Sequence, residues 1–276
     1  MIKNEKSLID RAKNYAVKND ITVNDVLQNF MFERVLERIS NSNYKNNFVF
    51  KGGVILSSII GLSNRTTLDI DTSLKGLNVS DDDLTNIINE ILHIDLNDNV
   101  NFNIYNYKHI ALEQNSNGIE YKITGQFGKI TINFLLDIVQ DNNITPREIE
   151  YKYKEILEDK SIDILTYSVE SMLSEKFYAI IKNGARSSRM KDYYDIYIMS
   201  KMKISKENLK IAIKNAFDKR NTKADIIEVQ IEKIKNSKEL SERWQNYRNS
   251  KSYARNIKFE DTLKALEKIK NIYNLQ

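Results

Sequence analysis

The sequence contains no cysteine, one proline and two histidines among its 276 residues. The lack of cysteine excludes a disulfide framework, a thiolate zinc site and a cysteine nucleophile, and two scattered histidines are too few for a histidine-based metal site. No apolar run approaches the roughly 18 residues that span a bilayer, and the polar amino-terminal stretch lacks the apolar core of a signal peptide. We therefore expect a globular, cytoplasmic protein without a membrane segment.

Charge is distributed unevenly along the chain. Residues 1–200 carry 23 basic and 28 acidic side chains, whereas residues 201–276 carry 19 basic and 10 acidic ones, a net charge of +9. A basic carboxy-terminal region suits an anionic partner such as RNA, although lysine-rich helices also serve as solvated faces. Among the arginines of this region, Trp244, Tyr247 and Tyr253 either stack on RNA bases or pack in the core.

Helical periodicity dominates both ends of the chain. Residues 1–45 favour two helices, the second of which begins at Thr22 as N-cap with Asp25 three residues later. Residues 151–276 show a helical pattern of apolar side chains, including a helix that stops at Gly184. We expect amino-terminal helices that pack on a core and a separate carboxy-terminal helical domain.

Between these regions, residues 46–150 favour strands. Runs rich in Ile, Tyr and Phe alternate apolar and polar side chains with a period of two and are separated by short polar turns. We expect Pro146, the only proline, to close the sheet. The sequence thus predicts an α+β fold with a mixed sheet core and a carboxy-terminal helical bundle.

The stretch FVFKGGVILSSIIGLSNRTTLDIDTSL carries the residues best suited to chemistry. A short strand ends at Gly52 and Gly53, and a later strand carries Asp69 and Asp71, whose side chains share one face of that strand. Adjacent carboxylates are unfavourable unless a cation neutralises them, and Asp137 from another strand would complete an oxygen-rich site suited to Mg²⁺. The glycine pair either lets backbone N–H groups approach phosphate oxygens or packs a helix start close to a strand.

These motifs resemble those of the AbiEii/AbiGii-type toxins, which are nucleotidyltransferase-like halves of bacterial phage-exclusion toxin–antitoxin pairs. KGG at 51–53 and RTTLDID at 65–71 are similar to the family's Lys-Gly-Gly-Thr and Arg-x-Ser-x-Asp-x-Asp, with Val54 and Thr67 as the departures. SEKFYAIIKNGARSSRMKDYYDIYIM is similar to the family's lysine-bearing helix followed by an Arg/Lys-Asp-x-x-Asp helix. The resemblance covers about residues 5–200 and implies a nucleotidyltransferase-like sheet domain.

The resemblance also implies roles for single residues. Asp69 and Asp71 would hold catalytic Mg²⁺, with Asp137 as the third ligand. Lys176 would place a point charge near the phosphates, and Asp192 would orient Lys176 or the nucleotide. The residues expected to contact the nucleotide are Gly52, Gly53, Arg65, Thr67 and Lys176.

By this resemblance the protein is an enzyme, the toxin of a toxin–antitoxin or abortive-infection system. It would transfer a nucleoside monophosphate from an NTP, either GTP or a pyrimidine NTP, to an acceptor. The tRNA 3′ end is the expected acceptor and a protein acceptor stays open, while the antitoxin is expected to be encoded separately and to form no stable complex. Two alternatives remain: a non-catalytic nucleotide- and RNA-binding module, and a metal-dependent nuclease.

Overall fold

The computed structural model describes residues 2–111 and 117–274, and these form two compact units. The amino-terminal unit comprises Met1–Asn143 with Glu148–Thr166, and the carboxy-terminal unit comprises Ile144–Arg147 with Tyr167–Gln276. Within the described ranges, no helix is both long enough and apolar enough to cross a membrane.

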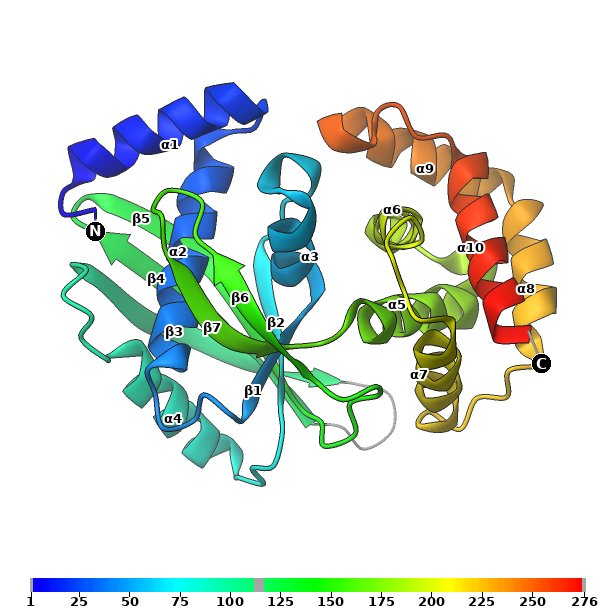
Figure 1. The fold of residues 1–276 in the computed structure, drawn as a ribbon, viewed down its shortest axis with the longest axis horizontal. Helices are drawn as coiled ribbons and strands as arrows, with labels where there is room; N and C mark the ends of the chain where they lie inside the picture. The colour runs from blue at the N-terminus through cyan, green and yellow to red at the C-terminus, as the bar shows by residue number, and fades with distance from the viewer. Residues whose placement is uncertain (1, 112–116, 275–276) are drawn as a thin grey trace. The chain divides into compact units, whose positions relative to one another are not determined.

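The amino-terminal unit is built on a mixed sheet (Figure 1). Within the described residues it has seven strands in the order β3-β4-β5-β2-β1-β7-β6. β2 pairs with β5 and β1 with β7 in parallel, while the other neighbouring strands run antiparallel. The strands are β1 Phe48–Lys51, β2 Asp69–Leu74, β3 Val100–Ala111, β4 Asn117–Phe127, β5 Ile130–Gln140, β6 Ile149–Lys154 and β7 Ser161–Thr166.

One face of this sheet packs against the second of the amino-terminal helices. Helix α2 is capped as its sequence predicts, because the Thr22 hydroxyl accepts a hydrogen bond from the Asp25 backbone N–H and the Asp25 carboxylate accepts one from the Thr22 backbone N–H. Phe32 of α2 meets Phe134 of β5 edge to face, with ring centroids 5.4 Å apart. The helices of this unit are α1 Glu5–Asn19, α2 Val23–Ser40, α3 Gly52–Ile60 and α4 Asp81–Leu92.

The sheet continues past the point where we expected it to end. β6 and β7 both follow Pro146, so the expectations that Pro146 closes the sheet and that the chain is helical from about residue 150 are wrong. β7 pairs in parallel with β1, and β6 pairs with β7. Ile162 and Ile164 are buried on alternate positions of β7. This short alternation alone predicts a strand only weakly, because the strand forms by pairing with the distant strand β1.

The carboxy-terminal unit is helical, as predicted. Helix α5 begins after Ser168, which caps it, and ends at Gly184, whose φ of 54° suits glycine. Trp244 is buried and donates its Nε1 hydrogen to the Ile257 carbonyl at 3.0 Å, so this aromatic residue packs in the core rather than on RNA. The helices are α5 Val169–Asn183, α6 Met190–Met199, α7 Lys206–Asp218, α8 Ile226–Lys235, α9 Lys238–Ser250 and α10 Phe259–Asn274.

Candidate active site

The glycine pair forms the junction between β1 and α3. Gly52 has a φ of 70°, and a Cβ atom at this position would lie 2.0 Å from Asp71 Oδ2. A Cβ atom at Gly53 would lie 2.5 Å from Thr67 Oγ1. Both glycines are therefore required by the close approach of the β2 segment to the start of α3. Lys51, the N-cap residue, makes no side-chain capping bond, so the helix start presents backbone N–H groups that suit an anion.

The carboxylates lie in neighbouring parallel strands of the same sheet. β2 and β5 are paired so that Asp71 is directly opposite Asp137, and Asp69 is opposite Leu135. Ile70 lies on the other face of β2 and is buried. The Asp-x-Asp alternation expected from the sequence is therefore present, and the register brings the third aspartate to the same row.

The Asp137 carboxyl has a strongly raised pKa. Burial raises its pKa to about 7, and the charges of Asp71, Glu120 and Asp69 add to that increase. Its Oδ1 is buried and has no hydrogen-bond partner among the residues that the structure describes. A buried, orphaned carboxylate oxygen with acidic neighbours is the donor chemistry that a hard divalent cation satisfies.

The side chains as they lie do not enclose a metal ion. Among the described residues, no three His, Cys, Asp or Glu side chains are grouped closely enough to hold one. The carboxylate oxygens are the kind of donor that Mg²⁺ prefers, but these side chains are not arranged around an ion. The ligand set expected from the sequence therefore stays a proposal.

A row of charged side chains extends the site on both sides, and sequence reasoning missed most of it. Lys51 of β1 is opposite Asp71, and Glu120 of β4 is opposite Asp137. Lys108 of β3 is opposite Glu120, and its Nζ lies 2.9 Å from Glu120 Oε1. Lys51 was visible beside the glycines, but Glu120 and Lys108 enter only through strand register, which the sequence does not specify.

The side chains of Arg65 and Thr67 form hydrogen bonds with neighbouring residues of the protein. Arg65 is fully buried, and its Nη1 donates to the carbonyl of Thr66. Thr67 donates its hydroxyl to Asp69 Oδ1. Both contacts lie within residues 65–69, and a nucleotide contact for either residue stays a proposal.

The carboxy-terminal unit holds the other expected residues. Lys176 of α5 lies 2.6 Å from Asp192 Oδ1 and 2.8 Å from Asp195 Oδ2, both on α6. Burial acts to lower the pKa of Lys176, but the charges of Asp195 and Asp192 outweigh it and raise that pKa, which keeps the ammonium protonated. Burial likewise opposes ionisation of Asp192, yet Lys176 and Arg189 lower its pKa overall. The motif expected from the sequence contains Lys176, Asp192 and Asp195, and the structure brings these three side chains together.

Two solved structures share this architecture. A candidate nucleotidyltransferase from H. pylori superposes with a TM-score of 0.53 at 12% identity, over 92% of this chain and 96% of that chain. JHP933 from Helicobacter pylori superposes with a TM-score of 0.50 at 11% identity, over 90% of this chain and 91% of that chain. At such low identity the likeness shows the fold alone.

The family is shown by sequence. A model of the family described as nucleotidyl transferase AbiEii toxin, type IV toxin–antitoxin system, matches residues 34–265, and this chain belongs to that family. No curated protein matches the sequence. The protein is therefore an enzyme of the nucleotidyltransferase class and a member of a toxin family, as the motifs predicted.

Proposed function

We propose that the protein uses Mg²⁺ to transfer a nucleoside monophosphate from an NTP to an acceptor hydroxyl. The observation that carries this proposal is the unpartnered Asp137 Oδ1, buried in the row that also contains Asp71. The start of α3, which has no side-chain cap, lies against Asp71 and supplies N–H groups for phosphate oxygens. Carboxylates for a cation and amides for a phosphate are thus adjacent in one unit.

The proposed reaction forms a bond between the acceptor oxygen and the α-phosphorus. The bond from that phosphorus to the bridging oxygen of the β-phosphate breaks, and pyrophosphate leaves with the electron pair. The acceptor hydroxyl releases its proton to water as its oxygen attacks the phosphorus. Mg²⁺ held by Asp69, Asp71 and Asp137 would neutralise charge on the phosphates.

Other residues support binding of the nucleotide. The Thr67 hydroxyl and the Arg65 guanidinium adjoin Gly53, and we propose that they contact the triphosphate. The two carboxylate partners of Lys176 keep its ammonium group protonated. Only the protonated group can act as a positive point charge toward phosphates. Its 2.6 Å contact supports an orienting role for Asp192.

We further propose that the acceptor is RNA, with the tRNA 3′ end as the first candidate, and that the NTP is GTP or a pyrimidine NTP. The net charge of +9 over residues 201–276 supports an anionic acceptor. The antitoxin would be a separate protein that forms no stable complex with this chain.

Labelled transfer assays test the proposal. The purified protein is incubated with Mg²⁺, total cellular RNA and each radiolabelled NTP in turn. We expect label at tRNA size, and loss of at least 100-fold in rate for Asp71→Asn, on the scale of removing a group that acts at the reacting phosphate. Asp163→Asn, an exposed aspartate on β7, is the matched control and should keep the wild-type rate.

The outcomes separate the alternatives. Label on protein would keep the transferase and change the acceptor. RNA that shortens without incorporating label would indicate a nuclease, and NTP binding without any transfer would indicate a non-catalytic module. Either of these last two results would refute the proposed activity.

A further inference from the structure

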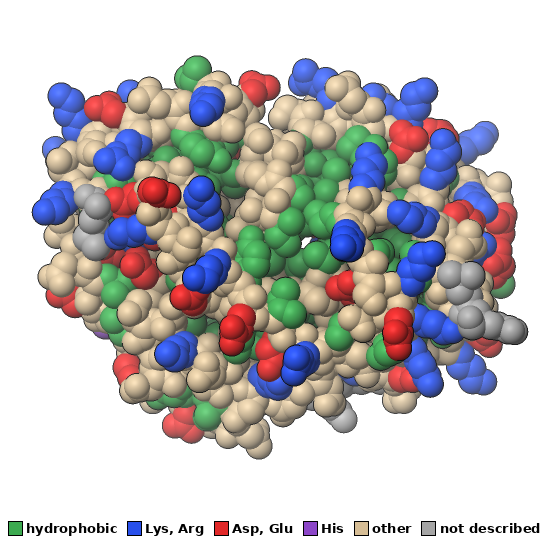
Figure 2. All heavy atoms as spheres, viewed as in Figure 1, with side chains coloured by type: hydrophobic (Ala, Val, Ile, Leu, Met, Phe, Trp, Pro, Cys, Tyr) green, Lys and Arg blue, Asp and Glu red, His purple; other side chains and the backbone are tan. Residues whose placement is uncertain are grey.

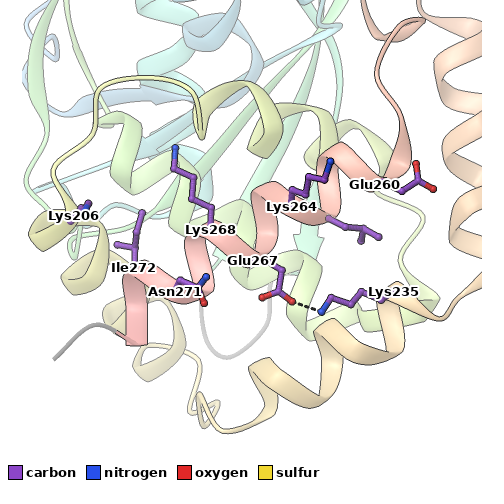
Figure 3. A pocket seen from close by; sticks show the side chains of 9 residues that line it. Lys206, Lys235, Glu260, Lys264, Glu267, Lys268, Asn271 and Ile272 are labelled. Atoms are coloured by element: carbon purple, nitrogen blue, oxygen red, sulfur yellow. Dashed lines mark ion pairs between the residues drawn. The ribbon is translucent and has the colours of Figure 1, made fainter.

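A groove in the carboxy-terminal unit lies far along the chain from the aspartate motifs. It has a volume of about 660 Å³ and is open to solvent along α10, with contributions from α7 and α8 (Figure 3). Leu263 and Ile272 give it an apolar floor. Its charged lining residues are Lys206, Lys235, Glu260, Lys264, Glu267 and Lys268.

The acidic side chain nearest the centre of the groove is already compensated. Glu267 Oε1 lies 2.5 Å from Lys235 Nζ, and Glu267 Oε2 lies 2.7 Å from Lys270 Nζ. Figure 3 shows Glu267 turned toward Lys235, on the opposite side of α10 from Lys264 and Lys268. The lining as a whole has four lysines against Glu260 and Glu267, a net charge of +2.

The remaining lysines are spaced along one side of the groove. Lys264 and Lys268 are four residues apart on α10, which places them about 6 Å apart along the helix axis. Lys264 is 79% exposed, and its Nζ lies 3.7 Å from Asp261 Oδ1. Lys206, the first residue of α7, is also exposed. Lys268 donates a hydrogen bond to the Ser200 carbonyl while its stem lines the groove. Glu260 is the acidic residue at the end of this side.

We propose that this groove binds the phosphodiester backbone of single-stranded RNA. Repeated ammonium groups at helical spacing match a polyanion, and an apolar floor suits sugar and base surfaces. Lysines present point charges rather than base-edge patterns, so binding is independent of sequence. Figure 2 shows Lys and Arg side chains over the carboxy-terminal helices, interspersed with acidic ones. The inference deepens the proposed function, on which its choice of RNA rests, by assigning a surface that holds the acceptor.

The test measures RNA binding without catalysis. A fluorescein-labelled 20-nucleotide single-stranded RNA of mixed sequence is titrated by anisotropy without NTP or Mg²⁺, at several salt concentrations. The test variant is Lys206→Gln/Lys264→Gln, and the matched control is Lys238→Gln/Lys251→Gln, which removes two exposed lysines outside the groove. Thermal melting of each variant checks that the fold is retained.

We expect the groove variant to bind RNA five- to twentyfold more weakly than the control. The slope of log affinity against log salt should fall by about 1.4, since each lost phosphate contact contributes about 0.7 for single strands. Equal affinity and slope for the two double variants, or no RNA binding by the wild type, would overturn the proposal. The binding assay contains no NTP and is therefore independent of catalysis. If RNA binds in this assay but the labelled transfer assay shows no nucleotide transfer, the proposed activity is refuted and the groove assignment stands.

Discussion

Gly52 is the residue at which local backbone and site chemistry are most tightly joined. Its φ of 70° disfavours any residue with a side chain. The Asp71 carboxylate occupies the space where that side chain would begin. Both restrictions follow from the chain's turn out of β1 into α3 directly beside β2. The glycine is thus needed whether or not a phosphate binds here.

Replacement of Gly52 by alanine should destabilise the amino-terminal unit by about 1–3 kcal/mol and displace Asp71, because strain and a steric clash act together. The matched control is Gly61→Ala, where φ is 92° but the nearest side-chain atom would be 3.6 Å from the new Cβ. That variant carries backbone strain without the clash, so it should lose about 1–3 kcal/mol of stability and keep its activity. Urea denaturation measures the stability of each variant, and the transfer assay measures its activity. An equal loss of activity in the two variants would contradict the role of Asp71.

At the scale of elements, α5 and α6 are joined by a buried cluster of one lysine and two aspartates. Asp192 and Asp195 lie three residues apart on α6, so both face Lys176 of α5. Arg189 also donates to Asp192. The cluster holds the two helices together as well as fixing the ammonium group.

Lys176→Met should therefore destabilise the carboxy-terminal unit by about 3–5 kcal/mol, since it leaves two buried carboxylates without their shared partner. Asp192→Asn should cost less, because Lys176 keeps Asp195 at 2.8 Å. Guanidinium denaturation compares the two variants. Should Asp192→Asn prove the more damaging, Asp195 could not be an effective partner of Lys176.

At the scale of the whole molecule, a buried network ties α2 to the segment that follows β6. Glu33 is almost fully buried and accepts hydrogen bonds from the Ile156 N–H at 2.9 Å and from Asn29 Nδ2 at 2.8 Å. Burial raises the pKa of Glu33 well above its ordinary value, and the Ile156 N–H offsets only part of that effect. Arg34 beside it pairs with Glu155 at 2.6 Å.

The raised pKa of Glu33 makes stability depend on pH. Folding takes up a proton between the unfolded pKa of about 4.3 and the higher folded value, so the free energy of unfolding falls as pH rises through that interval. Glu33→Gln keeps an oxygen acceptor without the charge and should stabilise the protein at pH 8 by about 1–3 kcal/mol, with a smaller effect at pH 4.5. Thermal melts at both pH values test this, with Glu90→Gln, at an exposed position, as control. A pH-independent difference would show that Glu33 ionises freely when folded.

Sequence reasoning succeeded where a structural feature depends on near neighbours. The Thr22 cap, the stop at Gly184 and the alternation of Asp69 and Asp71 each follow from a few adjacent residues. Family membership was visible for the same reason, since its motifs are short and contiguous.

Sequence reasoning failed where a structural feature depends on which distant strands pair with each other. β7 joins the sheet through β1, more than a hundred residues earlier in the chain, and Glu120 reaches the aspartate row only through the register of β4 with β5. The resemblance named Asp137 but could not reveal that its Oδ1 is buried without a partner. Burial and register are properties of the assembled sheet, so no local pattern encodes them.

The contact between Gly52 and Asp71 also constrains how this protein can change over generations. A larger residue at 52 forces the Asp71 side chain to shift or to be replaced by a shorter one, and either change disturbs the carboxylate opposite Asp137. Neither position can vary alone without loss of stability or of the site. We therefore expect the two residues to be conserved together in active homologues and to be substituted together in homologues that have lost the activity.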